Sequence, residues 1–119
     1  MSTAPSAILL GSGPAAFDVA RQIRESGVAL YWAQGDEVPG ASWMPALESV
    51  LESARTVLVL VGPGQDTRDA RVSLALDHVV ATGKRMIPVF LKDAKSADLA
   101  GFLATRMPVH VDELHRCRL

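Results

Sequence analysis

The chain has 119 residues, of which 49% are hydrophobic and 21% are charged, with a formal net charge of −1 at pH 7. The near-zero charge gives no electrostatic reason to expect binding to nucleic acid or to an anionic membrane, and the single cysteine, Cys117, excludes an intramolecular disulfide. No apolar run is long enough for a signal peptide or a membrane span, so we expect a cytoplasmic protein with one domain over residues 1–119, its core at about 7–114, and short tails at 1–6 and 115–119.

Short apolar runs alternate along the chain with stretches that have amphipathic spacing. Each run has the length of a strand that is buried on both faces. The five expected strands are Ala7–Leu10, Val28–Trp32, Thr56–Val61, Met86–Leu91 and Pro108–Val111. Strands that alternate with helices predict a mainly parallel sheet with helices on both faces, which is an α/β fold.

Between these runs, apolar residues recur every three or four positions, which predicts four helices. The residues expected to face the core are Val19, Ala20 and Ile23; then Trp43, Leu47, Val50, Leu51 and Ala54; then Val72, Ala75, Leu76, Val79 and Val80; and last Ala97, Ala100, Phe102 and Leu103. Gly27 and Gly83 stand where a left-handed residue commonly follows a helix. Ser42 and Ser96 are expected N-caps, whose side-chain oxygens would accept from free backbone N–H groups.

The turn after the first strand, Gly11-Ser-Gly-Pro-Ala-Ala16, fits the G-x-G-x-x-G/A fingerprint of dinucleotide-binding proteins. Glycines at this place let the backbone approach a pyrophosphate at a helix N-terminus. The candidate cofactor-binding residues are Gly11, Ser12 and Gly13. The second strand lacks the acidic residue that would hold a ribose, since it ends Tyr31-Trp-Ala-Gln34. A short turn of small residues is therefore the simpler interpretation, and a nucleotide-binding sensor is the alternative.

Several segments, taken in order, carry a resemblance to a known family. They are Val28–Trp32, Val38-Pro-Gly-Ala-Ser-Trp43, the helix Ala46–Arg55 with the strand Thr56–Pro63, Gly83-Lys-Arg-Met-Ile-Pro-Val-Phe-Leu91, Leu99–Leu103 and Val109–Asp112. With this order and spacing the chain resembles a bacterial Toll/interleukin-1 receptor (TIR) domain. The resemblance implies a flavodoxin-like three-layer sandwich, with a five-stranded parallel sheet in the order 2-1-3-4-5.

The resemblance implies one of two activities. Many TIR domains are interaction modules that assemble through the loop after the second strand. Others cleave NAD at the nicotinamide–ribose bond, with a glutamate near the start of the third helix that stabilises the developing positive charge. Counting back from Ile87-Pro88 through Ala75-Leu76 places Arg71 at the glutamate position, and the sequence has no glutamate between Glu52 and Glu113. The aromatic residue usual before that glutamate, and the aromatic and acidic residues usual in the first loop, are also missing.

A guanidinium would repel a developing cation and cannot act as a base near neutral pH. We therefore expect a catalytically inactive module of signalling or defence that needs no cofactor and assembles with other TIR-like domains, with itself or with a different protein. The expected interaction loop comprises Asp36, Glu37, Val38, Pro39, Gly40 and Trp43. A head-to-tail contact would pair Arg68 and Arg71 with the two loop acids of a neighbour.

The alternative is an NAD glycohydrolase with a displaced carboxylate, supplied by Asp69 or Asp66. NAD is the ligand in that case. The simpler interpretation of both aspartates is that they are N-cap and first-turn acids of the third helix. The histidines at 78, 110 and 115 lack metal-ligand spacing with one another or with Cys117, so no metal is expected.

Overall fold

A computed structural model describes residues 4–36, 39–95 and 106–116. Its strands form one sheet in the order β2-β1-β3-β4-β5, and all four pairings are parallel. The strands are β1 (Ala7–Leu10), β2 (Leu30–Trp32), β3 (Thr56–Val61), β4 (Arg85–Phe90) and β5 (Val109–His110). The helices are α1 (Gly13–Glu25), α2 (Trp43–Ser53), α3 (Ala70–Thr82) and the 3₁₀ helix η3 (Val111–Arg116). The strand order implied by the TIR resemblance is confirmed.

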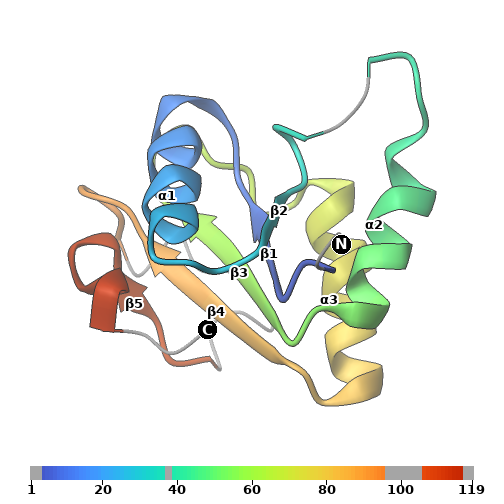
Figure 1. Cartoon of the computed structure of the whole chain (residues 1–119). Helices are drawn as coiled ribbons and strands as arrows, with labels where there is room; N and C mark the ends of the chain where they lie inside the picture. The colour runs from blue at the N-terminus through green and yellow to red at the C-terminus, as the bar shows by residue number, and fades with distance from the viewer. Residues whose placement is uncertain (1–3, 37–38, 96–105, 117–119) are drawn as a thin grey trace.

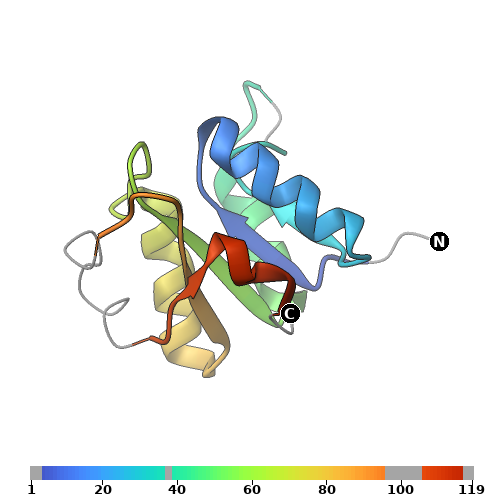
Figure 2. The same ribbon diagram turned by 90° about the vertical axis from the view of Figure 1, so that its left-hand side faces the viewer.

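The sheet lies between two layers of helices (Figure 1). Helix α1 covers one face, and α2 and α3 cover the other. In the view turned by 90°, η3 lies in front of the strands with α1 (Figure 2), and Leu114 of η3 joins the core on that face. The fold is therefore the flavodoxin-like three-layer sandwich.

Alternate residues of each strand feed two separate apolar cores, because successive side chains of a strand point to opposite faces. The α1 side holds Leu9 and Leu58 against Ile23, whereas the α2–α3 side holds Ile8 and Val57. Every residue of β1 and β3 is buried. This double burial explains why both strands read as unbroken apolar runs, and both were predicted with their observed limits.

Other predictions need correction. Strand β2 has three residues rather than the five of Val28–Trp32. Strand β4 begins and ends one residue earlier than predicted, and β5 is one residue shorter at each end. Val80 does not face the core, because its side chain is 61% exposed. It lies one position past the buried Val79, about 100° around the helix. The expected fourth helix and its N-cap Ser96 lie outside the described residues.

Helix ends follow the sequence in part. Gly27 and Gly83 have φ of 93° and 74°, as expected of glycines after a helix. Ser42 is the N-cap residue of α2, but its side chain makes no capping hydrogen bond. Helix α3, by contrast, has a side-chain cap, because Asp69 accepts from the backbone N–H of Arg71.

Candidate functional site

The glycine turn after β1 lies at the carboxyl edge of the sheet, where β1 meets β3. In this strand order the chain connections diverge between these two strands, and open α/β sheets bind ligands at such a point. A cavity of about 40 Å³ lies there. Its lining comes from the glycine turn, β3 and the start of α3, and includes Gln34, Gln65, Asp66 and Asp69. The topology thus brings Gly11 and Ser12 of the nucleotide-binding alternative together with Asp66 and Asp69 of the NAD-cleaving alternative.

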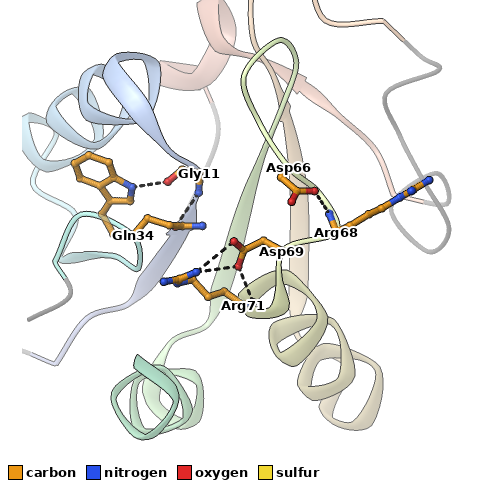
Figure 3. Close-up of polar contacts among 7 residues, drawn as sticks. Gly11, Gln34, Asp66, Arg68, Asp69 and Arg71 are labelled. Carbon is orange, nitrogen blue, oxygen red and sulfur yellow. Dashed lines mark hydrogen bonds and ion pairs between the residues drawn. The ribbon is translucent and has the colours of Figure 1, made fainter. Parts of the chain in front are cut away.

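Two glutamine side chains form hydrogen bonds with backbone groups of the glycine turn. The backbone N–H of Gly11 donates to Gln34 Oε1 at 3.0 Å (Figure 3), and that of Ser12 donates to Gln65 Oε1 at 2.8 Å. The amide of Gln65 also donates to the Ser12 carbonyl at 2.8 Å. The amides of Gly11 and Ser12, which a pyrophosphate would need, are therefore bonded within the chain. A phosphate would have to displace both side chains.

Sequence reasoning did not single out either glutamine. The available signal for Gln34 is its place just past the second strand, where a dinucleotide-binding fold has its acidic residue. Gln65 follows Gly62-Pro-Gly64, a turn that brings it beside a residue 53 positions earlier in the chain. Only the folded arrangement shows that both side chains reach the same turn.

Arg71 and Asp69 hydrogen-bond to each other at the start of α3 (Figure 3). Asp69 Oδ1 accepts from the backbone N–H of Arg71 at 2.8 Å, and Arg71 Nη1 lies 3.1 and 3.2 Å from the two carboxylate oxygens. The guanidinium carbon of Arg71 lies 5.0 Å from the ring centroid of Trp43, which is a cation–π distance. The Arg71 side chain, which the resemblance places at the glutamate position, therefore contacts a carboxylate and an aromatic ring.

Asp66 and Arg68 lie in the turn before α3. Asp66 Oδ1 accepts from the backbone N–H of Arg68 at 2.9 Å, so this aspartate stabilises the turn and lies before the helix rather than in its first turn. The Arg68 side chain is exposed and extends away from Arg71 (Figure 3). The N-cap interpretation of Asp69 is confirmed. The two arginines of the expected head-to-tail contact diverge.

Asp36, the first residue of the expected interaction loop, is bound to other residues of this chain. Asp36 pairs with Arg24 at 2.7 Å and accepts from the backbone N–H of Trp32 at 2.9 Å. Pro39 and Gly40 are exposed, and Gly40 has φ of 83°, as expected of a tight turn. Trp43 is half-buried against the core on the α2–α3 side. Glu37 and Val38 lie outside the described residues.

A larger groove lies on the other side of β2, and sequence reasoning missed it. Its volume is about 500 Å³, and it runs between α1 and the start of the loop after β2. Phe17 is 61% exposed there and meets Trp32 edge to face at 6.3 Å between ring centroids. Trp32 is held in place, because its indole N–H donates to the Gly11 carbonyl at 2.8 Å.

Two further observations concern the described part of the chain. No three of its His, Cys, Asp or Glu residues come together in a way that would hold a metal ion. None of its helices combines the length and apolar character that crossing a membrane requires.

Comparison with known proteins adds the family. A family model described as TIR domain matches residues 13–116. A metazoan TIR-STING receptor from C. gigas, solved in complex with 2',3'-cGAMP, is similar over 98% of this chain with a TM-score of 0.72 and 14% identity. This chain spans 40% of that receptor's length. The TIR domain of the Toll-related receptor TRR-2 from Hydra magnipapillata is similar over 91% of this chain and 86% of its own, with a TM-score of 0.62 and 12% identity. No curated protein matched.

Proposed function

Because this chain belongs to the TIR domain family, we propose that it is an interaction and self-assembly domain of signalling or defence that does not cleave NAD. The observation that carries this proposal is the small cavity between β1 and β3. Its volume is about 40 Å³, whereas pockets for cofactors and small molecules typically have about 300–1,000 Å³. The side chains of Gln34 and Gln65 line this cavity and accept from the backbone N–H groups of Gly11 and Ser12.

Two charged residues at the start of α3 support the same proposal. The count along the sequence puts Arg71 where the resemblance implies a glutamate, and its positive charge would oppose an oxocarbenium-like transition state. Asp69 is bonded both to the backbone and to the guanidinium of Arg71. A carboxylate held in this way is poorly placed to bind ribose hydroxyls.

The proposed contact surface is the loop after β2 with the start of α2. The exposed turn at Pro39 and Gly40 protrudes next to Trp43, an aromatic residue of the kind enriched at interfaces. The partner is another TIR domain, either a second copy of this chain or a domain of a different protein. Asp36 is a poor probe of this loop, because it also holds Arg24.

Light scattering over a concentration series tests the proposal. We expect the native chain to associate as its concentration rises, and we expect Pro39→Ala and Gly40→Ala to weaken that association. Gly83→Ala is the matched control, because Gly83 also has a positive φ and an added Cβ would meet nothing within 4 Å at either glycine. A strict monomer at high concentration, with no TIR partner in pull-downs, would contradict the proposal.

The second candidate function is NAD glycohydrolysis with a displaced carboxylate. The observation that favours it is that Asp66 and Asp69 both line the cavity between β1 and β3. It predicts nicotinamide release that is lost on Asp69→Ala or Asp66→Ala. Turnover that survives both substitutions would exclude this candidate.

A further inference from the structure

Strand β2 is an edge of the sheet in the part of the chain that the structure describes. Toward β1, the carbonyl of Ala29 accepts from Ala7 N–H at 3.3 Å, and Ala33 N–H donates to the Leu9 carbonyl at 3.0 Å. Because the direction of backbone groups alternates along a strand, Leu30 and Trp32 direct their N–H and C=O groups away from β1. The Trp32 carbonyl already accepts from the backbone N–H groups of Gly35 and Asp36, at 3.1 and 2.8 Å, so the Leu30 carbonyl and the Trp32 N–H are the groups on which another strand can pair.

Two side chains cover this edge. Arg24 Nη2, from α1, donates to the Leu30 carbonyl at 3.2 Å, and Asp36 Oδ2, from the loop after β2, accepts from Trp32 N–H at 2.9 Å. The two side chains are joined to each other by an ion pair of 2.7 Å. One donor and one acceptor thus occupy the places that the N–H and C=O of a neighbouring strand would take.

We infer that the Arg24–Asp36 pair takes the place of a residue in a sixth strand. When the pair is displaced, the edge that it covers can pair with β2 of a second copy of this chain. In an antiparallel pair with a two-fold axis at Tyr31, Leu30 of each copy lies opposite Trp32 of the other. The Trp32 N–H of each copy then donates to the Leu30 carbonyl of the other, which gives two hydrogen bonds across the axis. This inference concerns the β2 edge and does not depend on the proposed contact through Pro39 and Gly40.

The surroundings of the edge favour a second copy as the occupant. Displacing the pair releases one guanidinium and one carboxylate from each copy, so the two-fold interface gathers equal numbers of opposite charges. The adjoining groove of about 500 Å³ contains Phe17 and Trp32, and Arg24 and Asp36 also line it. When the pair swings away, two aromatic residues per copy lie beside the new strand pairing and add apolar contact area.

The test uses three variants of the full chain. Arg24→Ala removes the donor, and Asp36→Ala removes the acceptor. The exchange Arg24→Asp with Asp36→Arg keeps an ion pair, but a carboxylate cannot donate to the Leu30 carbonyl and a guanidinium cannot accept from Trp32 N–H. All three are expected to lower the dimer dissociation constant, measured by sedimentation, by about tenfold or more, which two released backbone hydrogen bonds can supply.

Arg21→Ala is the matched control. Arg21 lies on the same helix and lines the same groove, but it pairs with the side chains of Asp18 and Glu25, at 2.5 and 3.2 Å. It is expected to leave the dissociation constant unchanged. Thermal unfolding checks that every variant folds.

Amide hydrogen exchange locates the interface. Exchange at the Trp32 amide is expected to slow as each variant passes from monomer to dimer, while exchange at Ile8 in β1 stays constant. The inference is overturned if the three variants associate no more tightly than Arg21→Ala, or if they associate without protecting the Trp32 amide. It is also overturned if the charge exchange behaves like the native chain, because the ion pair alone would then cover the edge. Failure of the loop contact is seen separately, as an unchanged dissociation constant for Gly40→Ala.

Discussion

The cavity between β1 and β3 and the groove between α1 and β2 differ in the groups to which their polar side chains bind. In the cavity between β1 and β3, Gln34 and Gln65 bond to the backbone of the glycine turn, and about 40 Å³ remains. In the groove between α1 and β2, the charged side chains pair around the rim and leave two aromatic rings open, and about 500 Å³ remains. Topology therefore fixes where a hollow can form, and a few polar side chains decide whether it stays open.

The position of Trp32 in the groove depends on Gly35, and substitution of this glycine is expected to destabilise the fold more than any other change considered below. An added Cβ at Gly35 would lie 2.0 Å from Trp32 Cε3, so Gly35→Ala has to displace the indole and break its bond to the Gly11 carbonyl. We expect a loss of about 1–3 kcal/mol in the free energy of unfolding, measured by urea denaturation, with a shift in tryptophan emission.

Gly11→Ala is the counterpart in the small cavity. Its Cβ would lie 2.5 Å from Leu60 Cδ1, a buried side chain of β3, so it is also expected to destabilise the fold. Because the Gly11 carbonyl accepts from the Trp32 indole N–H, a shift in tryptophan emission is expected here too, but a smaller one than for Gly35→Ala. A larger shift for Gly11→Ala than for Gly35→Ala would contradict this order.

The closure of the small cavity is tested by Gln65→Ala. This change removes two hydrogen bonds to Ser12, and because the site is exposed to water we expect a loss of about 1 kcal/mol in the free energy of unfolding. Gln34→Ala removes one hydrogen bond, from the Gly11 N–H, and should lower the free energy of unfolding by less. Gln22→Ala is the control, since the Gln22 amide donates to the exposed side chain of Asp18 on the same helix. A loss for Gln65→Ala no greater than the control's would show that the cavity is closed by other groups.

The aspartate of the catalytic alternative is expected to act as a cap. Asp69→Ala should cost about 1 kcal/mol, because the N-cap bond to Arg71 N–H is lost. Ser42→Ala, at the N-cap of α2, should change stability by less than about 0.5 kcal/mol, because Ser42 makes no side-chain bond. Thermal denaturation of both variants checks the contrast, and equal losses would refute it.

The smallest effect is expected on the exposed face of α1. Hydrogen bonds from Arg21, and then from Gln22, lower the pKa of Asp18 below its ordinary value of 3.8. A carboxylate with a lowered pKa in the folded state stabilises the fold above pH 3.8, and this contribution is lost as the pH falls through the folded-state pKa. Asp18→Asn should therefore flatten the fall in unfolding free energy at acidic pH. Identical slopes for the two proteins would contradict this.

The sequence predicts the buried elements well, because their signal is local. Strands β1 and β3 are unbroken apolar runs, and Gly83 marks the end of α3. The strand order came from the family resemblance. Val80 was misplaced because a run of two valines fits the helical spacing, although only Val79 lies on the buried stripe.

The polar contacts of the candidate site were not predictable in this way. Ser12 and Gln65 are 53 residues apart, and Arg24 and Asp36 are 12 residues apart. No periodicity links such pairs, because they meet only when strands and helices are assembled. The sequence did identify Arg71 and Asp69 as the residues to examine, but not that they bind each other.

The most direct test of the closed cavity is nicotinamide release from NAD by the purified chain at high concentration, with and without a crowding agent that promotes assembly. The proposed function, which rests on a cavity of about 40 Å³ lined by Gln34 and Gln65 and on Arg71 standing where the resemblance implies a glutamate, predicts no release in either condition. Steady release that disappears on Asp69→Ala would contradict the proposed function and would assign Asp69 the role of the missing glutamate.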